Sequence, residues 1–147
     1  MPENFDEFVE NLQNEIINRE IKDYNEKLVT LCYNPQNWGK LLRDDITCFE
    51  ESRGGPKDYF LGFYLNVESN IIRKISFLTD GCGVMIATGS QTTILLEGKT
   101  LEFAQNLKAE DIDKALTGVP ENEKHCLDLA IKTLKSAIEK YKTKKLT

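Results

Sequence analysis

Apolar and polar residues alternate most regularly in the middle of the chain, over 59–67. Every second position there is large and apolar: Tyr59, Leu61, Phe63, Leu65 and Val67. This period of two predicts a strand with one buried face. Glu68-Ser69-Asn70 predicts a tight reversal, after which 71–78 returns as a second strand, antiparallel to the first. Residues 46–52 predict a further short strand, separated from 59–67 by a loop over 53–58.

Apolar residues at helical spacing flank these strands on both sides. Before the strands, residues 3–32 predict one long amphipathic helix. After them, we expect helices over 84–97, ended by Gly98, and over 109–116, with a short helix between them that Thr100 caps.

The last predicted helix begins at Pro120, because proline is favoured in the first turn of a helix. Its buried positions share one face: Leu127, Ala130, Ile131, Leu134, Ile138 and Tyr141. This order of strands and helices indicates a single α+β domain over residues 1–147, made of an N-terminal helix (1–32) and a core (33–145). We expect a three-stranded antiparallel sheet packed on one side by a helical layer, with long N-terminal and C-terminal helices.

Composition narrows the functional classes. The 147 residues carry a net charge of −5, which argues against a nucleic-acid partner. No apolar run reaches the ~18 residues of a membrane span, and the acidic start of the chain lacks the pattern of a secretory signal, so no membrane association is expected. We therefore expect a cytoplasmic protein whose four cysteines are reduced thiols. The single tryptophan, Trp38, is expected in the core.

Cys82 lies between two glycines in Thr79-Asp80-Gly81-Cys82-Gly83-Val84, where a predicted strand passes into a predicted helix. Glycine lets another group approach the backbone closely, and the first turn of a helix presents unpaired N–H groups with partial positive charge. A thiol there ionises easily, and the thiolate is both the nucleophile and the metal ligand. A lone cysteine more commonly serves as a small buried hydrophobic residue. Gly-Cys-Gly alone does not separate these two interpretations.

The other cysteines and the only histidine give weaker signals. His125 directly precedes Cys126, and adjacent helical residues point about 100° apart, so the two do not form a facing dyad by themselves. No Cys-x-x-Cys pair is present, which excludes a sequence-local zinc knuckle. Cys32 and Cys48 occupy positions expected to be structural, so alkylation is expected to label Cys82 and Cys126 faster.

Five short motifs follow one another between about residues 31 and 141: Tyr33-Asn34-Pro35-x-Asn37-x-Gly39, a loop ending in Asp58, Thr79-Asp80-Gly81-Cys82-Gly83, Gly98-Lys99-Thr100-Leu101 and Glu123-Lys124-His125-Cys126. In combination they resemble the NifU/IscU-type iron–sulfur cluster assembly scaffolds. The resemblance implies a scaffold or carrier, not an enzyme, that holds a labile iron–sulfur cluster, for instance [2Fe-2S], or else iron or zinc. It also implies two kinds of partner, a cysteine desulfurase that delivers sulfur and apo-proteins that accept the cluster.

The resemblance also implies a set of metal ligands at one exposed end of the domain. Matched residue by residue, these ligands are Asp58, Cys82, His125 and Cys126. In such scaffolds one cysteine accepts sulfur from the desulfurase. We expect Cys126 to be that acceptor here, because a helix start and His125 would favour its thiolate.

Two departures from the family pattern leave the function open. The family's first ligand cysteine, in Cys-Gly-Asp, is replaced in Pro56-Lys57-Asp58 by a proline that has no ligand atom, and Cys48 could compensate only if the intervening loop delivered it. The family's Pro-Pro-Val-Lys chaperone-recognition stretch is replaced by residues 120–124, so a chaperone partner is doubtful.

Two other functional interpretations therefore stand beside the scaffold. One is a degenerate scaffold paralogue that holds no cluster and acts as a protein-interaction module. The other is a thiol enzyme that uses Cys82 or Cys126 with His125, for which no organised set of nucleophile, base and orienting group is visible.

Overall fold

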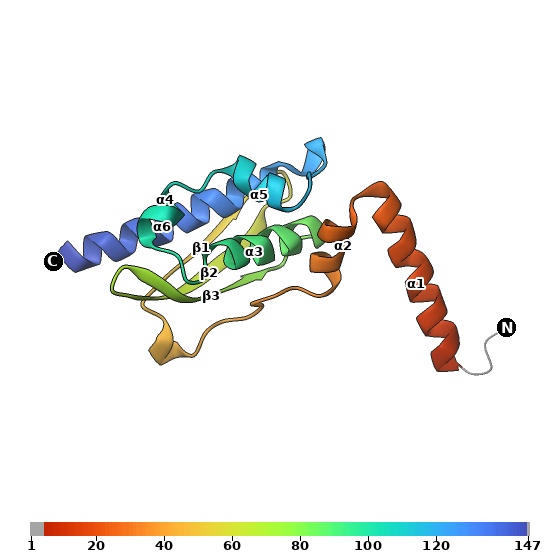
Figure 1. Ribbon diagram of the computed structural model, residues 1–147, viewed down its shortest axis with the longest axis horizontal. Coiled ribbons are helices and arrows are strands. Elements are labelled where there is room, and N and C mark those ends of the chain that lie inside the picture. The colour runs from red at the N-terminus through yellow and green to blue at the C-terminus, as the bar shows by residue number, and fades with distance from the viewer. Residues whose placement is uncertain (1–4, 147) are drawn as a thin grey trace.

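A computed structural model describes residues 5–146. In chain order its elements are α1 (Phe5–Asp23), α2 (Glu26–Tyr33), the 3₁₀ turn η1 (Arg43–Asp45), β1 (Cys48–Gly54), β2 (Tyr59–Glu68), β3 (Ile71–Thr79), α3 (Gly83–Leu96), α4 (Leu101–Gln105), α5 (Ala109–Ala115), the 3₁₀ turn η2 (Glu121–Glu123) and α6 (His125–Leu146). Figure 1 shows α3 to α6 gathered over the sheet and α1 projecting away from it. Among the described residues, no helix has the length and apolar character needed to cross a membrane.

The three strands form one antiparallel sheet in the order β1-β2-β3. At one end of the β1–β2 pair Cys48 lies opposite Leu65, and at the other end Gly54 lies opposite Tyr59. The predicted α+β class and the antiparallel three-stranded sheet are confirmed. β1 starts two residues later than predicted and runs on to Gly54, inside the predicted loop.

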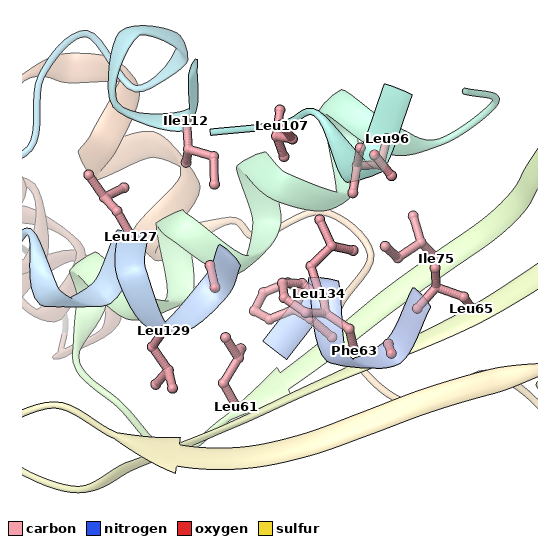
Figure 2. Close-up of a cluster of buried hydrophobic side chains, with 14 of the residues drawn as sticks. Leu61, Phe63, Leu65, Ile75, Leu96, Leu107, Ile112, Leu127, Leu129 and Leu134 are labelled. Carbon is pink, nitrogen blue, oxygen red and sulfur yellow. The ribbon is translucent and has the colours of Figure 1, made fainter. Parts of the chain in front are cut away.

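The hydrophobic core lies between one face of the sheet and the helices α3 and α6. Leu61, Phe63 and Leu65 of β2 are 0% exposed, and Figure 2 shows them clustered with Leu134 of α6. Burying one such side chain contributes about 1.5–3 kcal/mol relative to leaving it in water. The predicted stripe of α6 is buried at five positions, with Ile131 partly buried beside them: Leu127, Ala130, Leu134, Ile138 and Tyr141.

Trp38 lies at the edge of the sheet and not in the core. Gly39 N donates to Phe77 O at 2.8 Å and Phe77 N donates to Asn37 O at 3.0 Å, so the segment before β1 covers the edge of β3. The Trp38 ring packs edge-on against the Phe77 ring, with centroids 5.3 Å apart, and the residue is 47% exposed. The prediction of a core tryptophan is wrong, because the ring contacts the sheet on one side only.

The prediction of a single helix over 3–32 is wrong, since the structure has two helices with a break at Tyr24-Asn25. Residues 3 and 4 lie outside the described residues. Asn25 begins α2 with its side-chain oxygen, which accepts a hydrogen bond from Leu28 N at 2.8 Å. Its amide nitrogen donates to Gly118 O at 2.9 Å, which ties the start of α2 to the loop after α5.

The two N-terminal helices differ in burial. The side chains of residues 7–16 in α1 are exposed, whereas α2 buries Leu28, Val29 and Leu31. The helix that belongs to the packed body is therefore α2.

The last helix begins later than predicted. Pro120 precedes η2, in which Glu123 N donates to Pro120 O at 2.9 Å, and α6 starts only at His125. The prediction of a helix start at Pro120 is wrong, because this turn closes with i to i+3 bonds and does not continue into the α-helix. As a result, Glu123 lies in a turn directly before the first residues of α6.

Replacing Asn25 by alanine should lower the free energy of unfolding by about 1–2 kcal/mol, because it removes a helix cap and a second hydrogen bond. Urea unfolding monitored by circular dichroism measures this change. The exposed Asn122→Ala is the matched control and should stay within about 0.5 kcal/mol of wild type. Equal stability of the two variants would contradict the role given to Asn25.

Candidate metal centre

One end of the sheet brings together four chain segments that are far apart in sequence. The turn between β1 and β2 lies there, and so does the end of β3, since Thr79 is paired with Leu61. Gly54, at the end of β1, lies so close to α6 that a Cβ there would come within 2.9 Å of Leu129 Cδ1. α3 and α6 both begin at this end, and Figure 1 shows α2 beside the first turn of α3. All four predicted ligands therefore belong to segments at this end of the sheet.

The segment between β3 and α3 is fixed by its own polar side chains. Thr79 Oγ1 donates to Phe60 O at 2.5 Å and accepts from Gly81 N at 3.0 Å. Asp80 accepts from Phe60 N at 2.7 Å and forms an ion pair with Arg53 at 3.5 Å. These bonds to β1 and β2 hold the residues before Cys82 against the sheet.

The glycines on either side of Cys82 are needed for close approach. A Cβ at Gly81 would come within 2.8 Å of Met85 Cβ and 3.1 Å of the Tyr59 ring. A Cβ at Gly83 would collide with Cys32 Sγ. Neither glycine has a positive φ, so what decides these positions is the space taken by Tyr59, Met85 and Cys32.

Cys82, Glu123 and Cys126 form the centre of the site. One ligand atom from each of them lies within 4.8 Å of the other two. Two sulfurs bound to one zinc ion at about 2.3 Å in tetrahedral geometry lie about 3.8 Å apart, so the three donors need to move by only about 1 Å to bind an ion. Thiolate sulfur and carboxylate oxygen are both ordinary ligands of zinc, and thiolates hold iron–sulfur clusters. The donor set fits such a cargo without rearrangement of the fold.

His125 lies at the side of this group. Its Nδ1 is 3.8 Å from Cys126 Sγ, and its Nε2 is 3.6 Å from Glu123 Oε2. The histidine and the glutamate side chains are 24% and 22% exposed. Among the described residues, no lysine or arginine forms an ion pair with Glu123. A bound cation would therefore supply the positive charge that this carboxylate and the thiols lack.

The two thiols of the centre differ in their affinity for a proton. A hydrogen bond from the Cys126 thiol lowers the pKa of Cys82 the most, and the backbone N–H groups of Met85 and Val84 lower it further, whereas burial acts in the opposite direction. The Cys82 side chain does not form a capping hydrogen bond at the start of α3. These N–H groups therefore stabilise the thiolate through the partial positive charge of the helix start. The same contact with Cys82, together with burial, raises the pKa of Cys126. Cys82 is therefore the thiolate, and Cys126 keeps the proton that the pair shares.

Tyr59 is a further polar contact of the Cys82 sulfur. Its interaction with Cys82 raises the pKa of the Tyr59 hydroxyl to about 12, so the hydroxyl stays protonated and donates to the thiolate. Its ring centroid lies 6.2 Å from that of His125. Tyr59 thus connects the β1–β2 turn to two of the candidate ligands.

The structure brings together two of the four predicted ligands, Cys82 and Cys126, with His125 in contact with Cys126. Asp58 is exposed in the β1–β2 turn and does not belong to the group within 4.8 Å. Its N–H donates to Gly55 O at 3.1 Å, and Gly55 lies against His125, since a Cβ there would be 2.9 Å from Nδ1. Asp58 therefore lies at the same end of the sheet but outside the centre.

The reason for expecting sulfur on Cys126 is wrong. The helix start that stabilises a thiolate is that of α3, at Cys82, whereas Cys126 is 0% exposed and its pKa is raised. The assignment of the sulfur acceptor to Cys126 itself stays a prediction.

Cys48 cannot reach the centre. It is 7% exposed in β1, paired with Leu65 at the end of the strand opposite to Gly54, about 20 Å away along the strand. Burial raises the pKa of its thiol to about 11. The structural role expected of Cys48 agrees with this position, and the strand leaves no loop that could deliver it.

Comparison with known proteins assigns the chain to a family. The family described as NifU-like N terminal domain matches residues 23–147, which include every residue of the centre. The chain belongs to this family. It is 35% identical over 120 residues to the iron–sulfur cluster assembly scaffold protein IscU of Aquifex aeolicus, covering 81% of this chain and 76% of the relative. It is 35% identical over 124 residues to the scaffold protein IscU of Azotobacter vinelandii, covering 83% of this chain and 96% of the relative.

Solved structures share the fold of this NifU-like chain. The N-terminal part of a nitrogen-fixing NifU-like protein from Brucella abortus superposes with a TM-score of 0.63 at 15% identity, over 82% of this chain and 94% of that one. A putative iron–sulfur cluster assembly scaffold protein for the SUF system from Fervidobacterium islandicum gives a TM-score of 0.63 at 19% identity, over 80% and 98%.

Two residues of the site were not among the predicted ligands: Glu123, which belongs to the centre, and Tyr59, which contacts Cys82. Glu123 precedes Cys126 by three positions, a spacing that places two side chains on one side of a helical turn, and this signal could have found it. Tyr59 carried no such signal, because its alternation with Leu61 and Phe63 indicates a core position. Only the fold shows that its hydroxyl meets Cys82.

Alkylation with iodoacetamide should label Cys82 and Cys32 before Cys126 and Cys48, because the first two are partly exposed and the second two are buried. This order corrects the expectation that Cys82 and Cys126 react together. Since the pKa of Cys82 is lowered, its rate should hold as pH falls from 8 to 6, whereas an ordinary thiol slows by about tenfold per pH unit well below its pKa of about 8.5.

Mass spectrometry of the labelled peptides measures the four rates separately. Free cysteine added to the same reaction is the control for the intrinsic pH dependence. A Cys82 rate that falls in parallel with that of free cysteine would contradict the thiolate assigned to this residue.

Proposed function

We propose that this chain is an iron–sulfur cluster assembly scaffold that holds its cargo at the Cys82–Glu123–Cys126 centre. The observation that carries the proposal is the convergence of these donors within 4.8 Å in a member of the NifU-like family. Similarity to IscU scaffolds over four fifths of the chain supports the same activity. A scaffold needs ligands that bind an ion yet stay accessible, and Cys82 and Glu123 are both partly exposed.

The residues of the centre divide the chemistry between them. Cys82 is the first thiolate that an incoming iron or zinc ion meets, and the cation would then displace the proton that Cys126 keeps. Glu123 supplies an oxygen that is exchanged more easily than a sulfur. We propose His125 and Asp58, the other two predicted ligands, as donors that complete the coordination as the cargo changes, since the turn carrying Asp58 lies against His125. The cargo is a labile cluster, with [2Fe-2S] as the simplest form, or zinc in a tetrahedral site.

Sulfur delivery requires a partner, which we propose is a cysteine desulfurase. In this reaction a thiolate of the scaffold attacks the outer sulfur of the desulfurase persulfide, and the desulfurase thiolate leaves. The resemblance implies that one cysteine of the scaffold accepts this sulfur, and we propose Cys126. It can attack only after its proton has passed to another base such as Cys82. Apo-proteins that take up the finished cluster are the second class of partner. A cytoplasmic location fits a set of four cysteines that the structure shows without disulfides.

A second candidate function follows from Pro56, which replaces a ligand and lies in the exposed turn with Asp58. A degenerate paralogue that keeps the fold as a protein-interaction module would tolerate this replacement. Metal binding by the remaining donors separates the two functions.

A zinc titration at neutral pH tests the scaffold. Wild type should bind zinc stoichiometrically, and Cys82→Ser and Cys126→Ser should abolish this binding. Glu123→Gln should weaken it, and Asp58→Ala should weaken it by about tenfold or less, because water can take an outer position. Pro56→Cys should strengthen it. Affinity should fall as the pH drops, because protons compete with the metal ion for the two sulfurs.

Cys48→Ser is the matched control, because it removes a thiol outside the centre and should leave the affinity unchanged. Circular dichroism of each variant checks the fold. Wild-type affinity in Cys82→Ser would show that these residues are not a metal site and would favour the degenerate paralogue.

A further inference from the structure

Cys32 lies beside the metal centre, although it belongs to α2 and its sequence surroundings indicate a structural position. Its sulfur occupies the space that a Cβ of Gly83 would take. Gly83 follows Cys82 directly, and consecutive Cα atoms are about 3.8 Å apart. The Cys32 sulfur is therefore packed against the residue next to the proposed ligand.

Cys32 also lines the same pocket as two residues of the centre, Cys82 and Glu123. A pocket of about 400 Å³ is lined by residues of α2, of the start of α3 and of η2, among them Cys32, Cys82 and Glu123. Cys32 is partly exposed, so its sulfur is not sealed in the core as that of Cys48 is. Three potential ligand groups thus line one cavity from three different elements.

The position of Cys32 is fixed from both sides. Before it, Leu28 and Leu31 are buried in the core, at 2% and 8% exposure. After it, Gln36 N donates to Ser90 Oγ of α3 at 2.7 Å. The Cys32 sulfur lies outside the group within 4.8 Å, so it has to move toward Cys82 to share an ion. Because α2 is held to α3 before and after Cys32, this movement is confined to the neighbourhood of the start of α3.

We propose that Cys32 is the third sulfur ligand of this centre, in place of the ligand that Pro56 cannot provide. The inference rests on the proposed function, since it extends the same site. Cys32, Cys82 and Cys126 then give three thiolates, and Glu123 or His125 takes the fourth position. A set of three sulfurs and one oxygen or nitrogen is a closed tetrahedral arrangement for zinc. It also brings the site close to the full thiolate ligation that holds iron–sulfur clusters.

Anaerobic titration with Co²⁺ tests the proposal, because the sulfur-to-cobalt absorption band grows with the number of bound thiolates. Wild type should show the intensity of three thiolates. Cys32→Ala should still bind the ion but lose about one third of the intensity, since one of three soft ligands is removed. Cys48→Ala is the matched control and should keep the wild-type band. Cys32→Ser, which keeps the size of the side chain, should give the same loss of intensity. This variant separates the loss of a sulfur ligand from a packing defect caused by the smaller alanine.

Zinc protection against alkylation gives a second readout, which leaves Cys32 itself unchanged. Saturating zinc should slow alkylation of Cys32 together with that of Cys82, and in Cys82→Ala zinc should leave the Cys32 rate unchanged. An undiminished cobalt band in Cys32→Ala, or equal labelling of Cys32 with and without zinc, would overturn the assignment of Cys32. If neither the wild type nor any variant bound cobalt, the proposed function itself would fail. That result differs from a loss of the Cys32 assignment alone, in which the wild type still binds the ion.

Discussion

The candidate metal centre depends on the burial of one face of the sheet under α3 and α6. Their apolar side chains pack on Leu61, Phe63 and Leu65, which are fully buried, and this packing sets where each helix starts. Both helices start at the same end of the sheet, so Cys82 and Cys126 meet although 43 residues lie between them in the sequence. The ligands are brought together by the core, and no local motif has to do so.

Once together, the two thiols and Glu123 form a site that is incompletely neutralised. The pair shares one proton, which lies on Cys126, and Tyr59 donates a hydrogen bond to the Cys82 thiolate. The Nε2 atom of His125 lies 3.6 Å from Oε2 of Glu123. A divalent cation would replace the shared proton and neutralise the carboxylate at once. This balance explains why the arrangement suits a cargo that is bound and then released.

The sequence predicted most of the fold because its strongest patterns are set by burial. The alternation over 59–67 and the stripe of α6 both reflect the core, and both are found in the structure. The predictions that failed concern positions where a single polar contact decides. Asn25 caps α2 by accepting a hydrogen bond from Leu28 N, and its amide nitrogen donates to Gly118 O. The spacing of apolar residues does not indicate the contact with Gly118.

The candidate site was predictable only in part, for a related reason. Gly-Cys-Gly and His-Cys mark Cys82 and Cys126 as unusual, but the sequence does not say which sulfur keeps the proton. The roles of Tyr59 and Cys32 depend on side chains that approach the glycines at 81 and 83 from other elements. Such approaches join segments distant in sequence, so one sequence alone cannot reveal them.

Anaerobic reconstitution with iron and sulfide, followed by desalting, tests the central claim most directly. If Cys82, Glu123 and Cys126 form a scaffold site, the wild-type protein should retain iron and sulfide together and show visible sulfur-to-iron absorption. Cys82→Ala should lose both, whereas Cys48→Ala should keep them. A correctly folded wild-type protein that emerges colourless, without iron or sulfide, would contradict the account.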